Sequence, residues 1–254
     1  MQRCWYVAGL MSRVRTYHRP EHLDAALTLL ARTDVPTRAL GGGTIVNADS
    51  GLGSNPAPPV DVVDLQALGL SGISESAGEV RIGATATLQA IADHACAPDV
   101  IRTLARREQP STMRTLATLG GTVAQRDWES ELIAGLLAFD AVVHWRTVST
   151  DGTATATDAL PHGALITMVS IQTGDAVVDR TGRTPADVAI VSAVARRRVD
   201  GTIALALSGV SATPLLVDGP DAAAHLTPPG DFRGSSDYRR HLAQVLATRV
   251  CEKV

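Results

Sequence analysis

The sequence predicts an α+β fold, and three observations support this class. Segments with strand and helix character alternate along the chain, but they do not form a regular βαβ series. Two β-rich runs, 73–76 and 79–84, flank Ala77-Gly78 as a hairpin would. Apolar residues at Leu23, Ala26, Leu27 and Leu30 have the i, i+3, i+4, i+7 spacing of a helix face. With 45% hydrophobic residues among 254, the chain can bury a substantial core.

The first half of the chain opens with a predicted strand at 14–17, followed by the helix that carries the Leu23–Leu30 stripe. Further strands are expected at 38–40 and 60–65, separated by a loop at 50–59 that is rich in Gly, Ser, Asn and Pro. Beyond the hairpin, Thr87 is a suitable N-cap for a helix that contains Leu88, Ile91 and Ala92. A second helix is expected at 98–107.

The second half contains predicted strands at 141–145 and 164–171, with a polar, Thr-rich loop at 147–157 between them. After a break at 181–184, Pro185 and the run 186–194 suggest a helix. Arg196-Arg197-Arg198 is interpreted as a solvated helix end, with docking of a partner as the alternative. Strands at 203–210 and 215–217 and a closing helix at 237–250 complete the chain. Gly174-Asp175 and Thr181-Gly182 loosen the chain, so a domain boundary is expected near residue 175.

Charge and cysteine content exclude several classes of protein. The formal net charge is −3, which gives no indication of a nucleic-acid or anionic-membrane partner. Three widely spaced cysteines form no C-x-x-C pair, so neither an iron–sulfur cluster nor a cysteine-rich zinc site is expected, and the histidines show no metal-ligand spacing. The cysteine pattern suits a reducing cytoplasm, and no apolar run is long enough to span a membrane. Residues 1–12 are interpreted as an N-terminal extension.

Two glycine segments carry the candidate chemistry. They are Gly41-Gly42-Gly43-Thr44 and Thr118-Leu119-Gly120-Gly121. Glycine lets a backbone approach a diphosphate closely and tolerates positive φ, so successive amides can form an anion-binding nest. Either segment alone also suits an ordinary tight turn. The chain has no G-x-G-x-x-G after a strand and no G-x-x-x-x-G-K-[ST], so neither a Rossmann site nor a P-loop is supported.

Read together, these segments resemble the FAD-binding subunit of the molybdenum hydroxylases, the xanthine dehydrogenase and carbon monoxide dehydrogenase type. The strongest likeness is Met113–Gly121, which is similar to an Ile-Arg-Asn-x-Ala-Thr-Leu-Gly-Gly-Asn motif, and Gly41–Thr44 is similar to an Ala-Gly-Gly-Thr loop. Further matches follow in family order at Tyr17–Pro20, Val62–Leu65, Ile82–Leu88, Gly182–Ala189 and Asp237–Arg240.

The resemblance implies a two-subdomain FAD-binding domain of the PCMH or vanillyl-alcohol-oxidase type at 13–175, followed by a small C-terminal α+β flavoprotein domain at 176–254. It also implies that FAD takes electrons from an iron–sulfur subunit, beside a molybdopterin-binding large subunit, and passes them to NAD, a quinone or oxygen. No side chain is expected to act as a catalytic acid or base. The residues implied to hold FAD are Leu40, Gly41, Gly42, Gly43, Thr44, Ile45, Arg114, Ala117, Thr118, Gly120, Gly121, Thr122, Glu131 and Leu165.

The sequence departs from the family pattern at five positions: Thr115 and Thr122 replace two asparagines, Glu131 replaces an aspartate, and Gln125 and Trp128 replace a histidine and a proline. Thr115, Thr122 and the segment 147–163, which is shorter than the resemblance implies, favour an alternative, a non-redox scaffold subunit with an altered cofactor site. A stand-alone flavoenzyme is a second alternative. For Arg114, the choice lies between a phosphate or partner contact and a surface salt bridge. Glu131 either bonds FAD hydroxyls or caps the helix that follows it.

Overall fold

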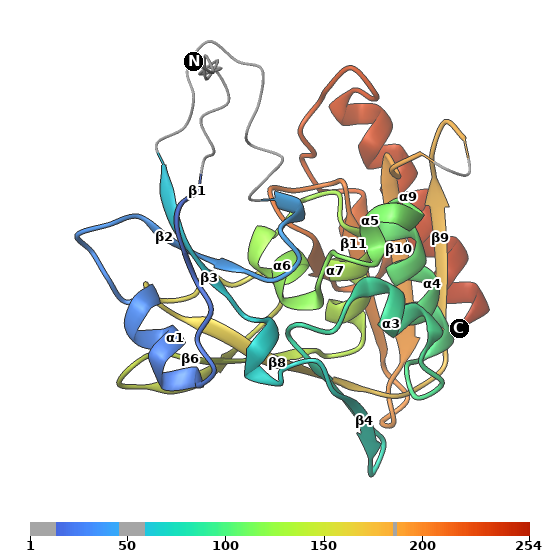
Figure 1. Ribbon diagram of the computed structural model, residues 1–254. Helices are drawn as coiled ribbons and strands as arrows, with labels where there is room; N and C mark the ends of the chain where they lie inside the picture. Colours follow the sequence, from blue (N-terminus) through green and yellow to red (C-terminus); the bar gives the residue numbers. More distant parts are fainter. Residues whose placement is uncertain (1–13, 46–58, 185–186) are drawn as a thin grey trace, which may run out of the picture.

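The computed structural model describes residues 14–45, 59–184 and 187–254. Its strands form sheets of three, five and four strands, and its helices lie between and beside these sheets. Figure 1 shows the three-stranded sheet at one end of the molecule, a group of helices in the middle and the four-stranded sheet at the other end. This arrangement confirms the predicted α+β class.

The three-stranded sheet is parallel and has the order β1-β3-β2. Its elements are β1 (Val14–His18), β2 (Thr37–Leu40), β3 (Val60–Asp64) and the connecting helix α1 (Leu23–Leu30). Every residue of the central strand β3 is buried. The apolar stripe of α1 packs in one cluster with Val63, Leu65 and Leu165, so this helix also contacts the start of the second sheet.

The five-stranded sheet is antiparallel and has the order β4-β5-β8-β6-β7. Its strands are β4 (Ile73–Ser76), β5 (Glu79–Gly83), β6 (Val142–Arg146), β7 (Asp151–Ala154) and β8 (Leu165–Gln172). The predicted hairpin is confirmed: Ala77 and Gly78 both have positive φ, which joins β4 to β5 in a two-residue turn. The predicted loop at 147–157 is wrong in part, because β7 lies within it. This strand is a polar sheet edge and therefore lacks an apolar alternation.

A group of helices lies between the two ends of the molecule. Its members are α3 (Leu88–Asp93), α4 (Asp99–Glu108), α5 (Ser111–Arg114), α6 (Leu119–Gln125) and α7 (Glu131–Ala138), and the short 3₁₀ helix η1 (Gln66–Leu68) follows β3. The predicted N-cap is confirmed, because Thr87 Oγ1 accepts a hydrogen bond of 3.1 Å from the backbone N–H of Ala90. All eight residues of α7 are buried, which makes this helix the centre of the largest hydrophobic cluster.

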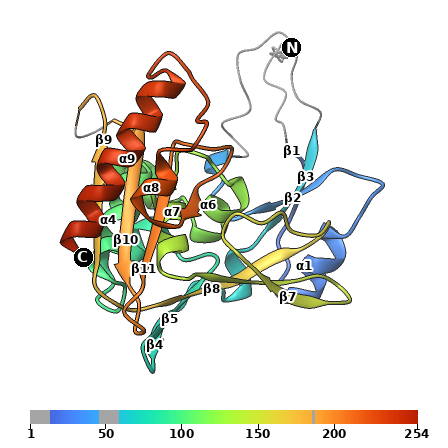
Figure 2. The ribbon, with the colours of Figure 1, turned by 180° about the vertical axis from the view of Figure 1, so that it is seen from behind.

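The four-stranded sheet is antiparallel and has the order β12-β11-β10-β9. Its elements are β9 (Ala176–Thr181), β10 (Val191–Arg197), β11 (Ile203–Ser208) and β12 (Leu215–Val217), followed by α8 (Gly219–Ala223) and α9 (Ser236–Lys253). Val194 and Ala206 belong to the cluster of α7, whereas their sheet neighbours Ala193 and Leu205 belong to the cluster of α9. The two helices therefore cover opposite faces of this sheet, and Figure 2 shows α9 along its outer face.

The predicted helix at 186–194 is wrong, because residues 191–197 form strand β10. Since both faces of β10 are covered, the strand is apolar on both sides and gives no period-two signal. The interpretation of Arg196-Arg197-Arg198 as a solvated helix end is wrong for the same reason. Arg196 is only 2% exposed, and its guanidinium donates to the backbone carbonyls of Ala138 and Thr173 and to the carboxylate of Asp140.

The largest hydrophobic cluster runs from the five-stranded sheet through α7 into the four-stranded sheet. Strand β9 begins at Ala176, but the two parts share this core, and a division into domains at residue 175 stays a prediction.

Three predictions lie wholly or largely outside the described residues: the extension at 1–12, the loop at 50–59 and the helix start at Pro185. Within the described ranges, no helix combines the length and the apolarity needed to cross a membrane.

Candidate functional site

The two glycine segments meet in space, as the sequence predicts. A Cβ on Gly41 would lie 2.5 Å from Thr118 Oγ1, and a Cβ on Gly42 would overlap the backbone carbonyl of Leu116. The segment 41–43 follows β2, and the segment 116–118 joins α5 to α6. Only glycine allows the two backbones to approach each other this closely.

Local structure fixes each segment. Leu40 ends β2, its carbonyl accepts a hydrogen bond from the Leu65 N–H, and Gly43 has a φ of 73° that turns the chain away from the strand. On the other side, Thr118 is the N-cap of α6 and its Oγ1 accepts a bond of 3.3 Å from the Gly121 N–H. A Cβ on Gly120 would lie 2.9 Å from Ala84, so this glycine lets α6 pack against the chain just after β5.

Two cavities open on either side of this contact. The larger has a volume of about 320 Å³ and the smaller about 60 Å³, and both are lined by Ala39, Gly41, Thr118 and Gly121. The shared lining shows that the two cavities are next to each other along the glycine segments. A volume of about 300–1,000 Å³ is typical of a ligand pocket, and the larger cavity falls within this range.

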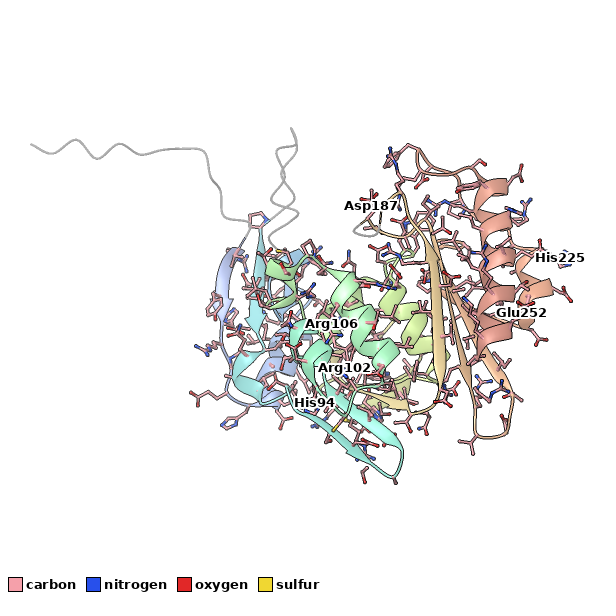
Figure 3. The ribbon with its side chains drawn as sticks, turned by 90° about the vertical axis from the view of Figure 1, so that its right-hand side faces the viewer. His94, Arg102, Arg106, Asp187, His225 and Glu252 are labelled. Carbon is pink, nitrogen blue, oxygen red and sulfur yellow. The ribbon has the colours of Figure 1, made fainter. Side chains whose placement is uncertain are left out.

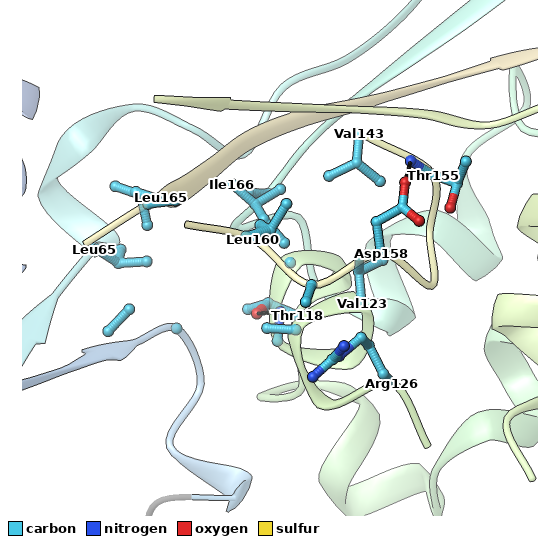
Figure 4. Close-up of a pocket in the computed structure, with 18 residues that line it drawn as sticks. Leu65, Thr118, Val123, Arg126, Val143, Thr155, Asp158, Leu160, Leu165 and Ile166 are labelled. Carbon is cyan, nitrogen blue, oxygen red and sulfur yellow. Dashed lines mark hydrogen bonds between the residues drawn. The ribbon is translucent and has the colours of Figure 1, made fainter. Parts of the chain in front are cut away.

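The larger cavity has mostly apolar walls (Figure 4). Leu65, Leu160, Leu165 and Ile166 are among the residues that line it, and they come from the segment after β3, the β7–β8 connection and the start of β8. Flat aromatic rings suit such walls, because they bury a large apolar area in a narrow space.

Sequence reasoning predicted Thr118 but missed the other polar side chains of this cavity. Figure 4 shows Thr155, Asp158 and Arg126 around it, the first two from the β7–β8 connection and the third from the end of α6. Asp158 Oδ2 accepts a bond of 2.7 Å from the Thr155 N–H, and Arg126 is a left-handed C-cap with a φ of 51°. Asp and Thr in a polar loop are ordinary turn residues, so no sequence signal singled them out.

Most of the predicted site residues line the two cavities. Those that do are Gly41, Gly42, Gly43, Thr44, Ile45, Ala117, Thr118, Gly120, Gly121, Thr122 and Leu165. Leu40, Arg114 and Glu131 line neither cavity. The contacts of all these residues with FAD stay a prediction.

Arg114 is bonded to the protein rather than turned towards the cavities. Its Nε donates to Gln89 Oε1 at 3.1 Å, and its Nη1 donates to the Arg106 carbonyl at 2.8 Å. The guanidinium therefore ties α5 to α3 and α4. These acceptors are neutral, so the alternative of a surface salt bridge for Arg114 is wrong within the described part of the chain.

Glu131 is 6% exposed and lies at the start of α7. Its Oε1 is 3.2 Å from Arg180 Nε, and its Oε2 is 4.0 Å from Arg107 Nη1. Burial raises the pKa of this carboxyl, although Arg180 and Arg107 act in the opposite direction. The side-chain cap of α7 is Ser130, whose Oγ accepts a bond of 3.0 Å from the Ile133 N–H, and Glu131 is the acidic residue in the first turn of this helix, as the second alternative expects.

Comparison with known proteins agrees with the FAD-binding family that the sequence resembles. The family model described as "FAD binding domain in molybdopterin dehydrogenase" matches residues 11–172. The chain is 26% identical to the uncharacterized protein YgfM of Escherichia coli K12 over 250 residues, 92% of this chain and 93% of the relative. It is also 26% identical to the carbon monoxide dehydrogenase medium chain of Afipia carboxidovorans over 276 residues, 93% and 95% of the two chains.

Solved structures extend the likeness to the fold. The cyanide-inactivated form of Cu,Mo-CO dehydrogenase superposes with a TM-score of 0.82 at 25% identity, covering 93% of this chain and 96% of the other. Quinoline 2-oxidoreductase from Pseudomonas putida 86 superposes with a TM-score of 0.80 at 24% identity, covering 94% and 95%. Both matches run through all three sheets, because they cover nearly the whole chain.

Proposed function

The chain belongs to the family of FAD-binding domains of molybdopterin dehydrogenases, and from this premise we propose that it takes electrons from an iron–sulfur subunit to FAD and passes them to an external acceptor. It is an FAD-binding oxidoreductase subunit of the carbon monoxide dehydrogenase type. The proposed complex also contains a molybdopterin-binding large subunit, and its acceptor is NAD, a quinone or oxygen. The proposed division of labour assigns residues 13–175 to FAD binding and 176–254 to a C-terminal flavoprotein domain.

The observation that carries the proposal is the contact between the two glycine segments. A Cβ at Gly41 would lie 2.5 Å from Thr118 Oγ1 and a Cβ at Gly42 would overlap the Leu116 carbonyl, so glycine at both positions is what lets the two segments lie side by side along one proposed diphosphate path. The proposed diphosphate contacts are backbone N–H groups of 41–45, because the first three N–H groups of α6 already donate to Ala86, Ala84 and Thr118. Bound FAD supplies the redox chemistry, and the protein supplies its position and surroundings.

The larger cavity is proposed to hold the adenosine end of FAD. Its apolar walls, among them Leu160 and Leu165, suit a planar base, and Asp158 offers a carboxylate to the polar edge of such a base. The flavin end of FAD is then proposed to lie on the other side of the glycine contact, at the smaller cavity. Thr122 and Gln125 line the smaller cavity on that side and offer hydroxyl and amide groups to a polar ring edge.

Titration of the purified chain with FAD tests this proposal, with flavin absorbance and fluorescence as the readout. We expect stoichiometric binding that ADP competes with and FMN does not, because the adenosine end is proposed to fill the larger cavity. Leu160→Glu places a charge in that cavity and should weaken FAD binding by about tenfold or more. The matched control Leu216→Glu lies on an exposed position of β12 and should bind FAD normally. Competition by FMN alone would reject the placement.

A second measurement tests the electron route. Bound FAD should be reduced by dithionite and by the reduced iron–sulfur subunit, and turnover of substrate should require the partner subunits. A colourless protein that does not take up added FAD would reject the proposal in favour of a scaffold. Turnover by the purified chain alone would instead identify a stand-alone flavoenzyme.

A further inference from the structure

A third cavity, with a polar lining, lies away from the glycine segments, between the end of α4 and the turn that follows β9. Its volume is about 330 Å³, and its lining residues in the described part of the chain are Arg107, Arg180, Gly182, Arg183 and Thr184. In Figure 3, Arg102 and Arg106 mark the course of α4 towards the loop that carries Asp187. The cavity therefore joins two segments that are more than seventy residues apart in the chain.

The lining is positively charged. Three guanidinium groups reach the cavity, and Glu131 is the carboxylate that contacts two of them, at 3.2 Å from Arg180 and 4.0 Å from Arg107. Asp187 is exposed and supplies a second negative charge next to the lining, where its carboxylate accepts a bond of 3.1 Å from the Thr184 N–H. Arg183 is exposed and has no ion-pair or hydrogen-bond partner among the described residues. The cavity thus holds more positive than negative charge.

One of the three arginines is already fixed in place. Arg180 has a side chain that is 13% exposed, with its Nε beside Glu131 and its guanidinium donating to the Asp187 carbonyl. A fixed guanidinium binds an anion with little loss of conformational entropy, and its planar fork matches the spacing of phosphate oxygens. Arg107 and Arg183 are more exposed, so they can adjust around a ligand.

We propose that this arginine cavity binds a phosphate group of a small anionic ligand, at a site separate from the FAD cradle. None of its five lining residues lines either cavity at the glycine segments. A phosphate dianion matches the excess positive charge better than a monocarboxylate, and it accepts several N–H bonds at once. The class of ligand is therefore a phosphorylated small molecule such as a nucleotide. This site goes beyond the electron-transfer function proposed above.

Calorimetric titration with inorganic pyrophosphate tests the proposal on both the FAD-free and the FAD-loaded chain. We expect saturable binding in both forms and much weaker binding of acetate. Loss of one charge-assisted contact in Arg183→Gln or Arg107→Gln should weaken pyrophosphate binding by about tenfold or more. The control is Arg81→Gln, an exposed arginine that is paired with Glu79 on the β4–β5 hairpin and should leave binding unchanged.

Three results would overturn the proposal: absence of saturable pyrophosphate binding, equal affinity in wild type and Arg183→Gln, or loss of binding when FAD is loaded. The third result would assign the cavity to the FAD site itself. Flavin absorbance reports FAD loading independently, so a failure of FAD binding is distinguished from a failure of this site. Circular dichroism of each variant confirms that the fold is retained.

Discussion

Gly42→Ala is the substitution that most directly tests the contact between the two glycine segments. The new Cβ would overlap the Leu116 carbonyl at less than half of a normal separation, which is about 3.5–4 Å between non-bonded heavy atoms. Both atoms that would collide with it belong to the backbone, so no side-chain rotation relieves the overlap. The segment 116–118 would have to retreat by roughly 2 Å from 41–43.

A movement of this size affects both stability and cofactor binding. Overpacking costs about 1–3 kcal/mol in a well-packed core and occasionally more, and a backbone collision belongs at the upper end. We therefore expect the free energy of unfolding to fall by about 3 kcal/mol. A displacement of roughly 2 Å also takes amides out of hydrogen-bond range of a diphosphate. Each lost charge-assisted bond is worth about 1.5–3 kcal/mol, so FAD affinity should fall at least about tenfold.

Urea unfolding followed by circular dichroism measures the first effect, and FAD titration under native conditions measures the second. Gly72→Ala is the matched control, because a Cβ at Gly72 meets no atom within 4 Å. It should change neither quantity appreciably. If Gly42→Ala and Gly72→Ala behave alike in both assays, the two segments do not form the close contact described here, and the argument for the cradle fails.

Three further substitutions test other parts of the structure. Burial raises the pKa of Glu108 to about 7 from an ordinary value of 4.5, so the native state holds this proton more tightly and the free energy of unfolding should fall as pH rises from about 4.5 to 7. Glu108→Gln should flatten that slope in urea titrations at several pH values. Arg196→Met leaves the buried acceptors of this side chain without a donor, so the free energy of unfolding in urea should fall by about 3–5 kcal/mol. The exposed Arg197→Met should lower it by about 0.5 kcal/mol or less. Thr118→Ala removes the N-cap of α6 and should cost about 1 kcal/mol in thermal unfolding, whereas Thr118→Ser should restore most of the loss.

Elements defined by local chemistry were predictable from the sequence. Thr87 marks a helix start because its hydroxyl satisfies a backbone N–H within the same turn. The Ala77-Gly78 hairpin and the α1 stripe are equally local, since each depends on residues only a few positions apart. The glycine segments were recognisable because a close backbone approach leaves few alternatives to glycine.

The tertiary structure decided the features that depend on distant partners. Residues 191–197 form a strand whose two faces are covered by α7 and α9. A continuous apolar run in the sequence does not show which elements will cover it, so it does not distinguish a buried strand from a buried helix. Arg196 is buried for the same reason, since its acceptors at Ala138 and Thr173 reach it only through the packing of α7 and β8 against the four-stranded sheet.

The same distinction applies to the candidate site, since one part of it was predictable from the sequence and the other part depends on the tertiary structure. By itself, the sequence determined the two glycine segments, because their chemistry is written in consecutive residues. Only the tertiary structure added Asp158 and Arg126 to the apolar cavity and placed Arg180 beside Glu131. Single polar side chains become part of a site when folding brings together segments that lie far apart in the chain. Their spacing in the sequence does not show that they will be close in space.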